Sequence, residues 1–175
     1  MLVVGMTGVK MGDRFVQIGC AHGARFAAIA AKVGLSGRAL VVVPDEASAA
    51  RARKGAEQAG VLVEIEAGPP TRLSMEDESF DLAIIDDTGG LLATLNANDQ
   101  VAAVREVRRI LRPGGRVMVI GAVPRSGLAA IFSRAQKSGP PFDPTPVLSA
   151  DAFRSVRTLA ERDGLVFVEA LKPRT

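Results

Sequence analysis

The 175-residue chain has no tryptophan, no tyrosine and only seven phenylalanines. Nucleic-acid-binding grooves use aromatic side chains that stack on bases, and cages for methylated ammonium groups are built from the same side chains. The net charge of +3 is too small to indicate nucleic-acid binding by itself. The composition therefore argues against a nucleic-acid partner.

Cysteine and long apolar runs are also scarce. A single cysteine, Cys20, excludes a disulfide framework. No apolar run approaches the ~18 residues that a membrane-spanning helix needs, and residues 1–10 lack the basic region of a secretion signal. These features predict a cytoplasmic protein that does not bind membranes. With 47% hydrophobic residues, the chain is expected to form a single domain over 1–175.

Short β-branched runs alternate with alanine-rich stretches of helical period, which is typical of a parallel sheet covered by helices. We predict an α/β fold: a Rossmann-like, doubly wound, mostly parallel sheet of about six strands with helices on both faces. The predicted strands are 14–18, 39–43, 61–66, 81–85, 116–120 and 165–171. The predicted helices follow residue 23 and span 46–59, 100–111, 128–137 and 149–162. A proline-rich loop at 122–148 has the length of a lid or binding segment.

Three segments carry a resemblance to a known family. Residues 8–23 form a strand that ends in a glycine-rich turn, residues 79–86 form a strand that ends in an acid, and residues 104–120 form a helix, a Pro-Gly-Gly break and a strand. In this order and spacing they resemble the class I S-adenosylmethionine-dependent methyltransferases. The resemblance implies methyl transfer from S-adenosylmethionine to an acceptor that the sequence does not identify and that we expect to be a small molecule.

The resemblance also implies a set of cofactor-binding positions. The turn would hold the amino-acid end of the cofactor, because glycine allows a positive φ and a close approach to the backbone. Val43 and Pro44 would flank the ribose and the adenine, and Asp45 would either replace a missing acid or cap a helix. The turn residues in this set are Gly19, Cys20, Ala21 and Gly23.

Several of these positions depart from the family pattern. The family usually has an acid where this chain has Gln17, a middle glycine at Ala21, a ribose-binding acid at Val43 and an adenine-binding Asp at Pro69. A buried hydroxyl that lacks a partner costs about 1–3 kcal/mol. We therefore expect weakened or absent cofactor binding. A catalytically inactive, methyltransferase-like binding or assembly subunit stays open as the alternative.

Two residues are candidates for catalysis. Asp86 ends the fourth predicted strand and so lies at the mouth of the expected cleft, and it is also placed to contact the cofactor. His22, the only histidine, lies inside the glycine-rich turn and would be a base if it faced the ligand. No metal site is predicted, because further ligands for Asp86 are not evident. A dinucleotide-binding role is disfavoured, since the turn lacks the Gly-x-Gly-x-x-Gly pattern.

The end of the chain carries a prediction about assembly. Only one strand is predicted after the helix at 149–162, so the sheet should end on an exposed strand. Exposed sheet edges pair with other chains. The sequence therefore predicts a homodimer or a larger protein assembly.

Overall fold

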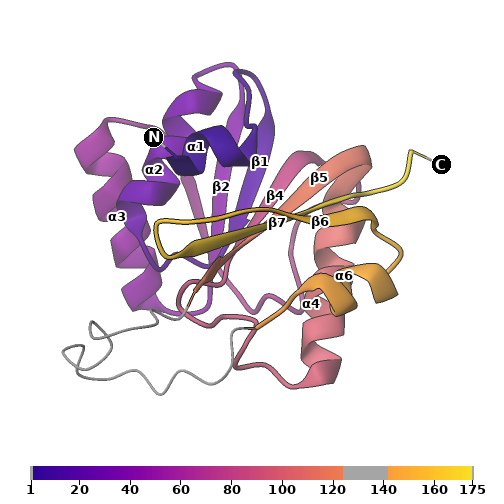
Figure 1. Cartoon of the computed structure of the whole chain (residues 1–175). Helices are drawn as coiled ribbons and strands as arrows, with labels where there is room; N and C mark the ends of the chain where they lie inside the picture. Colours follow the sequence, from indigo (N-terminus) through magenta and orange to yellow (C-terminus); the bar gives the residue numbers. More distant parts are fainter. Residues whose placement is uncertain (1, 124–141, 175) are drawn as a thin grey trace, which may run out of the picture.

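A seven-stranded sheet in the order β3-β2-β1-β4-β5-β7-β6 forms the centre of the protein (Figure 1). The computed structural model describes residues 2–123 and 142–174. The pairs among the first five strands are parallel, whereas β7 runs antiparallel to both β5 and β6. The strands are β1 (Arg14–Ile18), β2 (Arg38–Val43), β3 (Glu64–Ala67), β4 (Phe80–Asp86), β5 (Leu111–Ala122), β6 (Arg154–Arg162) and β7 (Leu165–Leu171).

Helices cover both faces of the sheet, which confirms the Rossmann-like α/β prediction. Figure 1 shows α1, α2 and α3 on one side and α4 and α6 on the other. Alternate strand residues serve the two layers: Phe15 packs with Phe26 of α2, and Val16 belongs to the core that contains Val104 of α4. The helices are α1 (Leu2–Thr7), α2 (Gly23–Val33), α3 (Glu46–Ala59), α4 (Ala97–Ile110) and α6 (Thr145–Ala150).

The helix predicted at 149–162 is wrong. Residues 154–162 form the edge strand β6, and only the short helix α6 precedes it. Val156, Leu159 and Ala160 have the spacing of a helical stripe, which explains the misassignment. In the structure two register shifts interrupt β6, and Ser155 has a positive φ of 54°, so the strand does not show a simple two-residue alternation.

Three other boundaries differ from the prediction. The third strand begins at Glu64 rather than at residue 61, and α4 begins at Ala97, where the Asn96 side chain accepts a hydrogen bond from the Asp99 N–H. The fifth strand begins at Leu111, because its pairing with β4 continues across the Pro-Gly-Gly segment with a shift of register. The helix predicted at 128–137 lies outside the described residues.

The extra strand changes the prediction about the sheet edge. β6 pairs along β7, so β7 is not the exposed edge of the sheet. The prediction that the sheet ends on the strand 165–171 is therefore wrong. The outer strand carries Arg154, Arg157 and Arg162, and charged side chains and bulges are common protections of an edge strand. In the described parts of the chain, no helix is long and apolar enough to cross a membrane.

Candidate functional site

The carboxyl ends of β1, β2 and β4 surround a cavity of about 250 Å³. The chain runs from β1 outward to β2 and β3 and then returns to β4 on the other side of β1, so the strand order reverses at this point. Doubly wound sheets bind ligands in the crevice at such a switch point. Six residues predicted from the sequence line this cavity: Gly19, Cys20, Ala21, Pro44, Asp45 and Asp86.

The turn after β1 requires glycine at its first position. Gly19 has a φ of +83°, and its N–H donates to the Val42 carbonyl oxygen at 2.8 Å. A Cβ at this position would lie 2.9 Å from Cδ2 of Leu91 and 3.1 Å from the Asp86 carbonyl oxygen. Both the backbone conformation and the space around it therefore exclude a side chain.

Gly23 has a different role from the one the sequence suggested. It does not have the positive φ expected of it, and it begins α2. A Cβ on Gly23 would collide with the backbone carbonyl of Arg51, and a Cβ on Gly55 would collide with Gly23 itself. Gly23 therefore serves the close contact between α2 and α3.

Side chains from three elements hold two successive peptide groups of the turn, Gly19–Cys20 and Cys20–Ala21. Gln17, buried in β1, donates from Nε2 to the Gly19 carbonyl oxygen at 2.8 Å. Arg51 of α3 donates from Nε to the Cys20 carbonyl oxygen at 2.9 Å. The Ala21 N–H donates to Oδ2 of Asp86 at 3.0 Å. The turn is thus fixed on its peptide groups.

Asp86 is the centre of a buried polar network. Its side chain is almost fully buried, and Oδ1 accepts hydrogen bonds from the Thr88 hydroxyl at 2.6 Å and the Thr88 N–H at 3.2 Å. Arg25 forms an ion pair with the same oxygen at 3.3 Å and also donates to the Thr88 hydroxyl. The predicted catalytic carboxylate is therefore engaged by its own chain, through Arg25, Thr88 and Ala21.

Asp87 shapes the segment that follows β4. Its Oδ1 accepts the N–H groups of Leu92 at 2.6 Å and of Ala93 at 3.3 Å. Burial raises the pKa of this carboxyl above its usual value, and the nearby charge of Asp86 acts in the same direction. These bonds hold the segment that places Leu91 over Gly19.

Asp45 caps α3 at the edge of the cavity. Its Oδ1 accepts the Ser48 N–H at 2.7 Å, and this hydrogen bond lowers the pKa of the carboxyl. Arg51 donates to the Ser48 hydroxyl at 2.7 Å, so one cation and one carboxylate lie side by side on this wall. The capping role considered for Asp45 is present, and the carboxylate is also exposed to the cavity.

The remaining predicted residues do not form part of the cavity lining. His22 is exposed and its side chain does not cap α2, Val43 is fully buried, and Pro69 is exposed beyond the end of β3. Cys20 does line the cavity, but burial raises the pKa of its thiol to about 11. The thiol therefore stays protonated at neutral pH and is a poor nucleophile.

Residues 15–115 match the family model described as "Methyltransferase domain". The chain belongs to this family. Over 120 residues it is 28% identical to "Methyltransferase GfsG" of Streptomyces halstedii, a match that covers 69% of this chain and 41% of that protein. Over 110 residues it is 32% identical to an uncharacterized 37.1 kDa protein in transposon TN4556 of Streptomyces fradiae, covering 63% of this chain and 30% of that one. The methyltransferase domain thus spans less than half the length of these curated relatives.

Solved structures agree on the fold. The structure of a SAM-dependent methyltransferase from Aquifex aeolicus superposes with a TM-score of 0.73 at 17% sequence identity, covering 97% of this chain and 87% of that one. At this identity the likeness concerns the fold. It places the methyltransferase domain among proteins with the same fold.

The cavity fits part of an S-adenosylmethionine molecule. The carboxylate of Asp45 and the guanidinium of Arg51 suit a ligand that carries an amino acid. Val43 offers no acceptor for a ribose hydroxyl, and the amide of Gln17 already bonds to Gly19. Within residues 2–123 and 142–174, no three His, Cys, Asp or Glu side chains lie together as a metal site.

Arg25, Thr88 and Arg51 were missed by the sequence analysis. Arg25 and Arg51 are two of 17 arginines in the chain, and nothing in the residues around them sets them apart. Their roles depend on which helix face meets the turn after β1, and that is a property of the folded chain.

Proposed function

We propose that this methyltransferase domain binds S-adenosylmethionine over the turn after β1 and transfers its methyl group to a small-molecule acceptor. The supporting observation is the threefold fixation of that turn by Gln17, Arg51 and Asp86. Each of these side chains comes from a different element, and each holds a peptide group of the turn. Such preorganisation is what a backbone-mediated ligand site requires.

The chain's own residues would act mainly by positioning. S-adenosylmethionine, when bound, supplies an electrophilic methyl group, and the protein has to hold an acceptor in line with it. Pro44 provides an apolar wall, and Asp45 presents a carboxylate that accepts hydrogen bonds. Among the described residues, Asp86 is engaged by Ala21, Thr88 and Arg25, and His22 is outside the cavity, so we assign the general-base role to neither of them.

The loss of polar anchors supports weak cofactor binding. Val43 is fully buried, apolar and outside the cavity lining, so it offers a ribose hydroxyl no acceptor. The same observation supports the second candidate, a catalytically inactive binding or assembly subunit. The cytoplasmic location expected from the sequence stays a prediction.

Calorimetric titration with S-adenosylhomocysteine and S-adenosylmethionine tests the proposal, using the wild type and the variants Gly19→Ala and Gly60→Ala. Gly19→Ala should abolish binding, because the new Cβ meets Leu91 and Asp86. Gly60 is a matched control, since it also has a positive φ, of 65°, and a Cβ there meets nothing within 4 Å. Equal binding by both variants would contradict the assignment of the turn.

The same titration separates the two candidate functions. Binding of either ligand by the wild type supports the methyltransferase. A folded wild type that binds neither ligand would favour the binding or assembly subunit. Methyl-transfer assays with candidate acceptors are then justified only for a chain that binds.

A further inference from the structure

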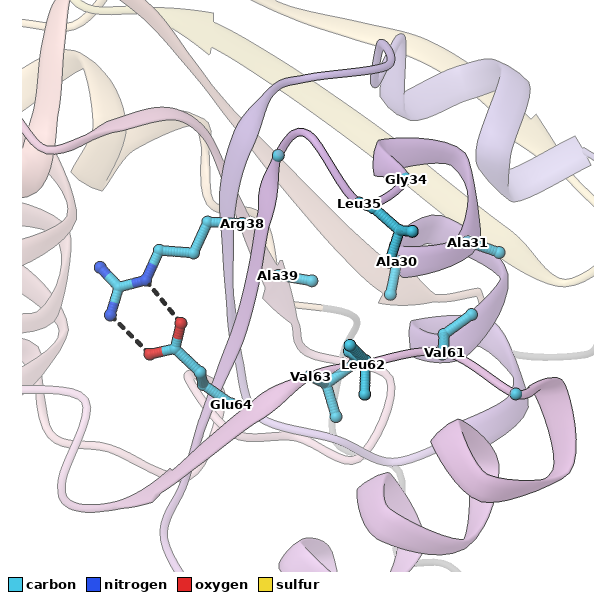
Figure 2. Close-up of a pocket in the computed structure, with 12 residues that line it drawn as sticks. Ala30, Ala31, Gly34, Leu35, Arg38, Ala39, Val61, Leu62, Val63 and Glu64 are labelled. Carbon is cyan, nitrogen blue, oxygen red and sulfur yellow. Dashed lines mark hydrogen bonds and ion pairs between the residues drawn. The ribbon is translucent and has the colours of Figure 1, made fainter.

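A second hollow, of about 430 Å³, lies at the opposite end of the sheet from the candidate site (Figure 2). It opens beside the amino ends of β2 and β3. Ala30 and Ala31 of α2 form one wall, Val61 and Val63 form the other, and Ala39 of β2 lies between them. Its volume is within the range of about 300–1,000 Å³ that is common for binding pockets.

The lining of this hollow is mostly apolar. Among the described residues that line it, Arg38 and Glu64 carry charge, and they bond to each other at 2.8 and 2.6 Å. Figure 2 shows the guanidinium and the carboxylate facing one another, away from Ala30 and Val61. Their charges are therefore satisfied, and the hollow suits an apolar side chain better than a polar ligand.

Exposed apolar side chains gather around the same hollow. Leu35 and Leu62 line it and are 90% and 82% exposed. Met11 is 77% exposed and lies beside Gly34, another lining residue. In the described parts of the chain the other large exposed apolar residue is Leu171, at only 36%. A concentration of exposed apolar surface of this kind marks an interaction site.

We propose that this face, defined by Met11, Leu35, Leu62 and the hollow between them, pairs two copies of the chain about a two-fold axis. A two-fold interface uses one surface patch twice, so the patch has to contain both a protruding group and a place to receive it. Leu62 protrudes beside the hollow. A cavity of about 150 Å³ already accepts a benzene molecule, so the hollow has room for a leucine side chain from a second copy.

Charge at the rim favours the same partner. Lys32, in the last turn of α2, directly follows the lining residue Ala31, and its side chain is exposed. Glu57, in the last turn of α3, is also exposed, and its carbonyl oxygen accepts the N–H of the lining residue Gly60 at 3.2 Å. When each Leu62 enters the other hollow, the end of α2 in one copy would face the end of α3 in the other, which would bring these opposite charges together.

This interface differs from the one that the sequence predicted. The sequence placed the exposed edge at the last strand, which β6 covers in the structure. The proposed face lies at the other edge of the sheet, beside β3. It leaves the cavity at the carboxyl ends of β1 and β4 open, so the pairing does not depend on the proposed methyl transfer.

Size-exclusion chromatography with light scattering over a range of concentrations tests the proposal. Concentration has to be followed by refractive index, since the chain has neither tryptophan nor tyrosine. The variants are Leu62→Asp and Leu35→Asp, with Ala150→Asp as the control because Ala150 is exposed on α6, on the other side of the sheet. Circular dichroism confirms that each variant folds, which is expected because all three side chains are exposed.

The expected result is a wild-type dimer whose dissociation constant rises at least about tenfold in Leu62→Asp and in Leu35→Asp, because a charge would enter an apolar hollow. Ala150→Asp should match the wild type. A wild type that stays monomeric at every concentration overturns the proposal. A dimer that both leucine variants preserve also overturns it, because the copies would then meet through another surface.

Discussion

Gly23 and Gly55 bring the backbones of α2 and α3 into direct contact. A Cβ on either glycine would overlap the backbone of the facing helix, which is not free to move aside as a flexible side chain would be. The contact also sets the position of Arg51, which reaches from α3 to the Cys20 carbonyl oxygen. The helix pair and the turn after β1 therefore depend on the same two glycines.

The variant Gly55→Ala should lower the free energy of unfolding by about 1–3 kcal/mol, the usual cost of overpacking. This loss would exceed the gain of up to about 1 kcal/mol that alanine brings to a helix. Urea denaturation followed by circular dichroism measures it. Gly5→Ala is the control: a Cβ on Gly5 of α1 meets nothing within 4 Å, so this variant should be neutral or slightly stabilised.

The variant Asp86→Asn should be destabilised by about 1–3 kcal/mol, because a neutral amide leaves Arg25 without its buried counter-charge and replaces an acceptor by a donor. It should also weaken binding of S-adenosylhomocysteine, since the Ala21 N–H loses its fixed acceptor. Asp77→Asn removes an exposed partner of Arg109 and should cost less than about 1 kcal/mol. A similar loss in both variants would argue against the network.

The sheet, the first three β-α units and the glycine turn could be predicted because each rests on local pattern. The run 39–43 is apolar throughout, the run 14–18 is buried from Phe15 to Ile18, and Gly19 stands where a strand must turn into a helix. The strand β6 could not be predicted in the same way. Its apolar residues are few and have a helical spacing in the sequence, and the strand accommodates that spacing through bulges. Only the pairing with β7 decides the conformation.

The candidate site was predictable in place but not in detail. Sequence position alone put Asp86 at the cavity and identified Gly19. It assigned Asp86 to catalysis, whereas the carboxylate bonds to Thr88, two residues on, and to Ala21 and Arg25, which come from the turn after β1 and from α2. Partners that are distant in the chain are brought together by packing, and no local sequence pattern indicates them.

The raised pKa of Asp87 predicts a specific pH dependence. A carboxyl whose pKa is higher in the folded state than in the unfolded chain stabilises the fold while protonated, and this contribution is lost as the pH rises through the folded-state pKa. The usual value is 3.8, so the loss should occur above that pH. Asn at position 87 keeps an acceptor for the Leu92 and Ala93 N–H groups without the charge.

The difference in unfolding free energy between Asp87→Asn and the wild type should therefore shift in favour of the variant as the pH rises from about 4 towards neutrality. Denaturation curves at several pH values measure this difference, and titrations common to both proteins cancel in it. A difference that is constant with pH would show that Asp87 titrates alike in the folded and unfolded chains.

Leu91 should limit access to the turn after β1. Its Cδ2 lies 2.9 Å from the position that a Cβ on Gly19 would occupy. Leu91 therefore covers the Gly19 backbone, which the absence of a side chain would otherwise leave open to a ligand. The cavity of about 250 Å³ is below the common range for small-molecule sites of about 300–1,000 Å³. Leu91→Ala should enlarge it and bind S-adenosylhomocysteine more tightly than the wild type, as calorimetry would measure.

Leu95→Ala provides the comparison for this variant. Leu95 is a partly buried leucine of the same segment that packs on the same core but does not line the cavity, so its truncation should lower stability without a gain in affinity. Weaker binding by Leu91→Ala than by Leu95→Ala would give Leu91 the opposite role. It would then be an apolar wall that contacts the ligand, and the ligand would bind without displacing it.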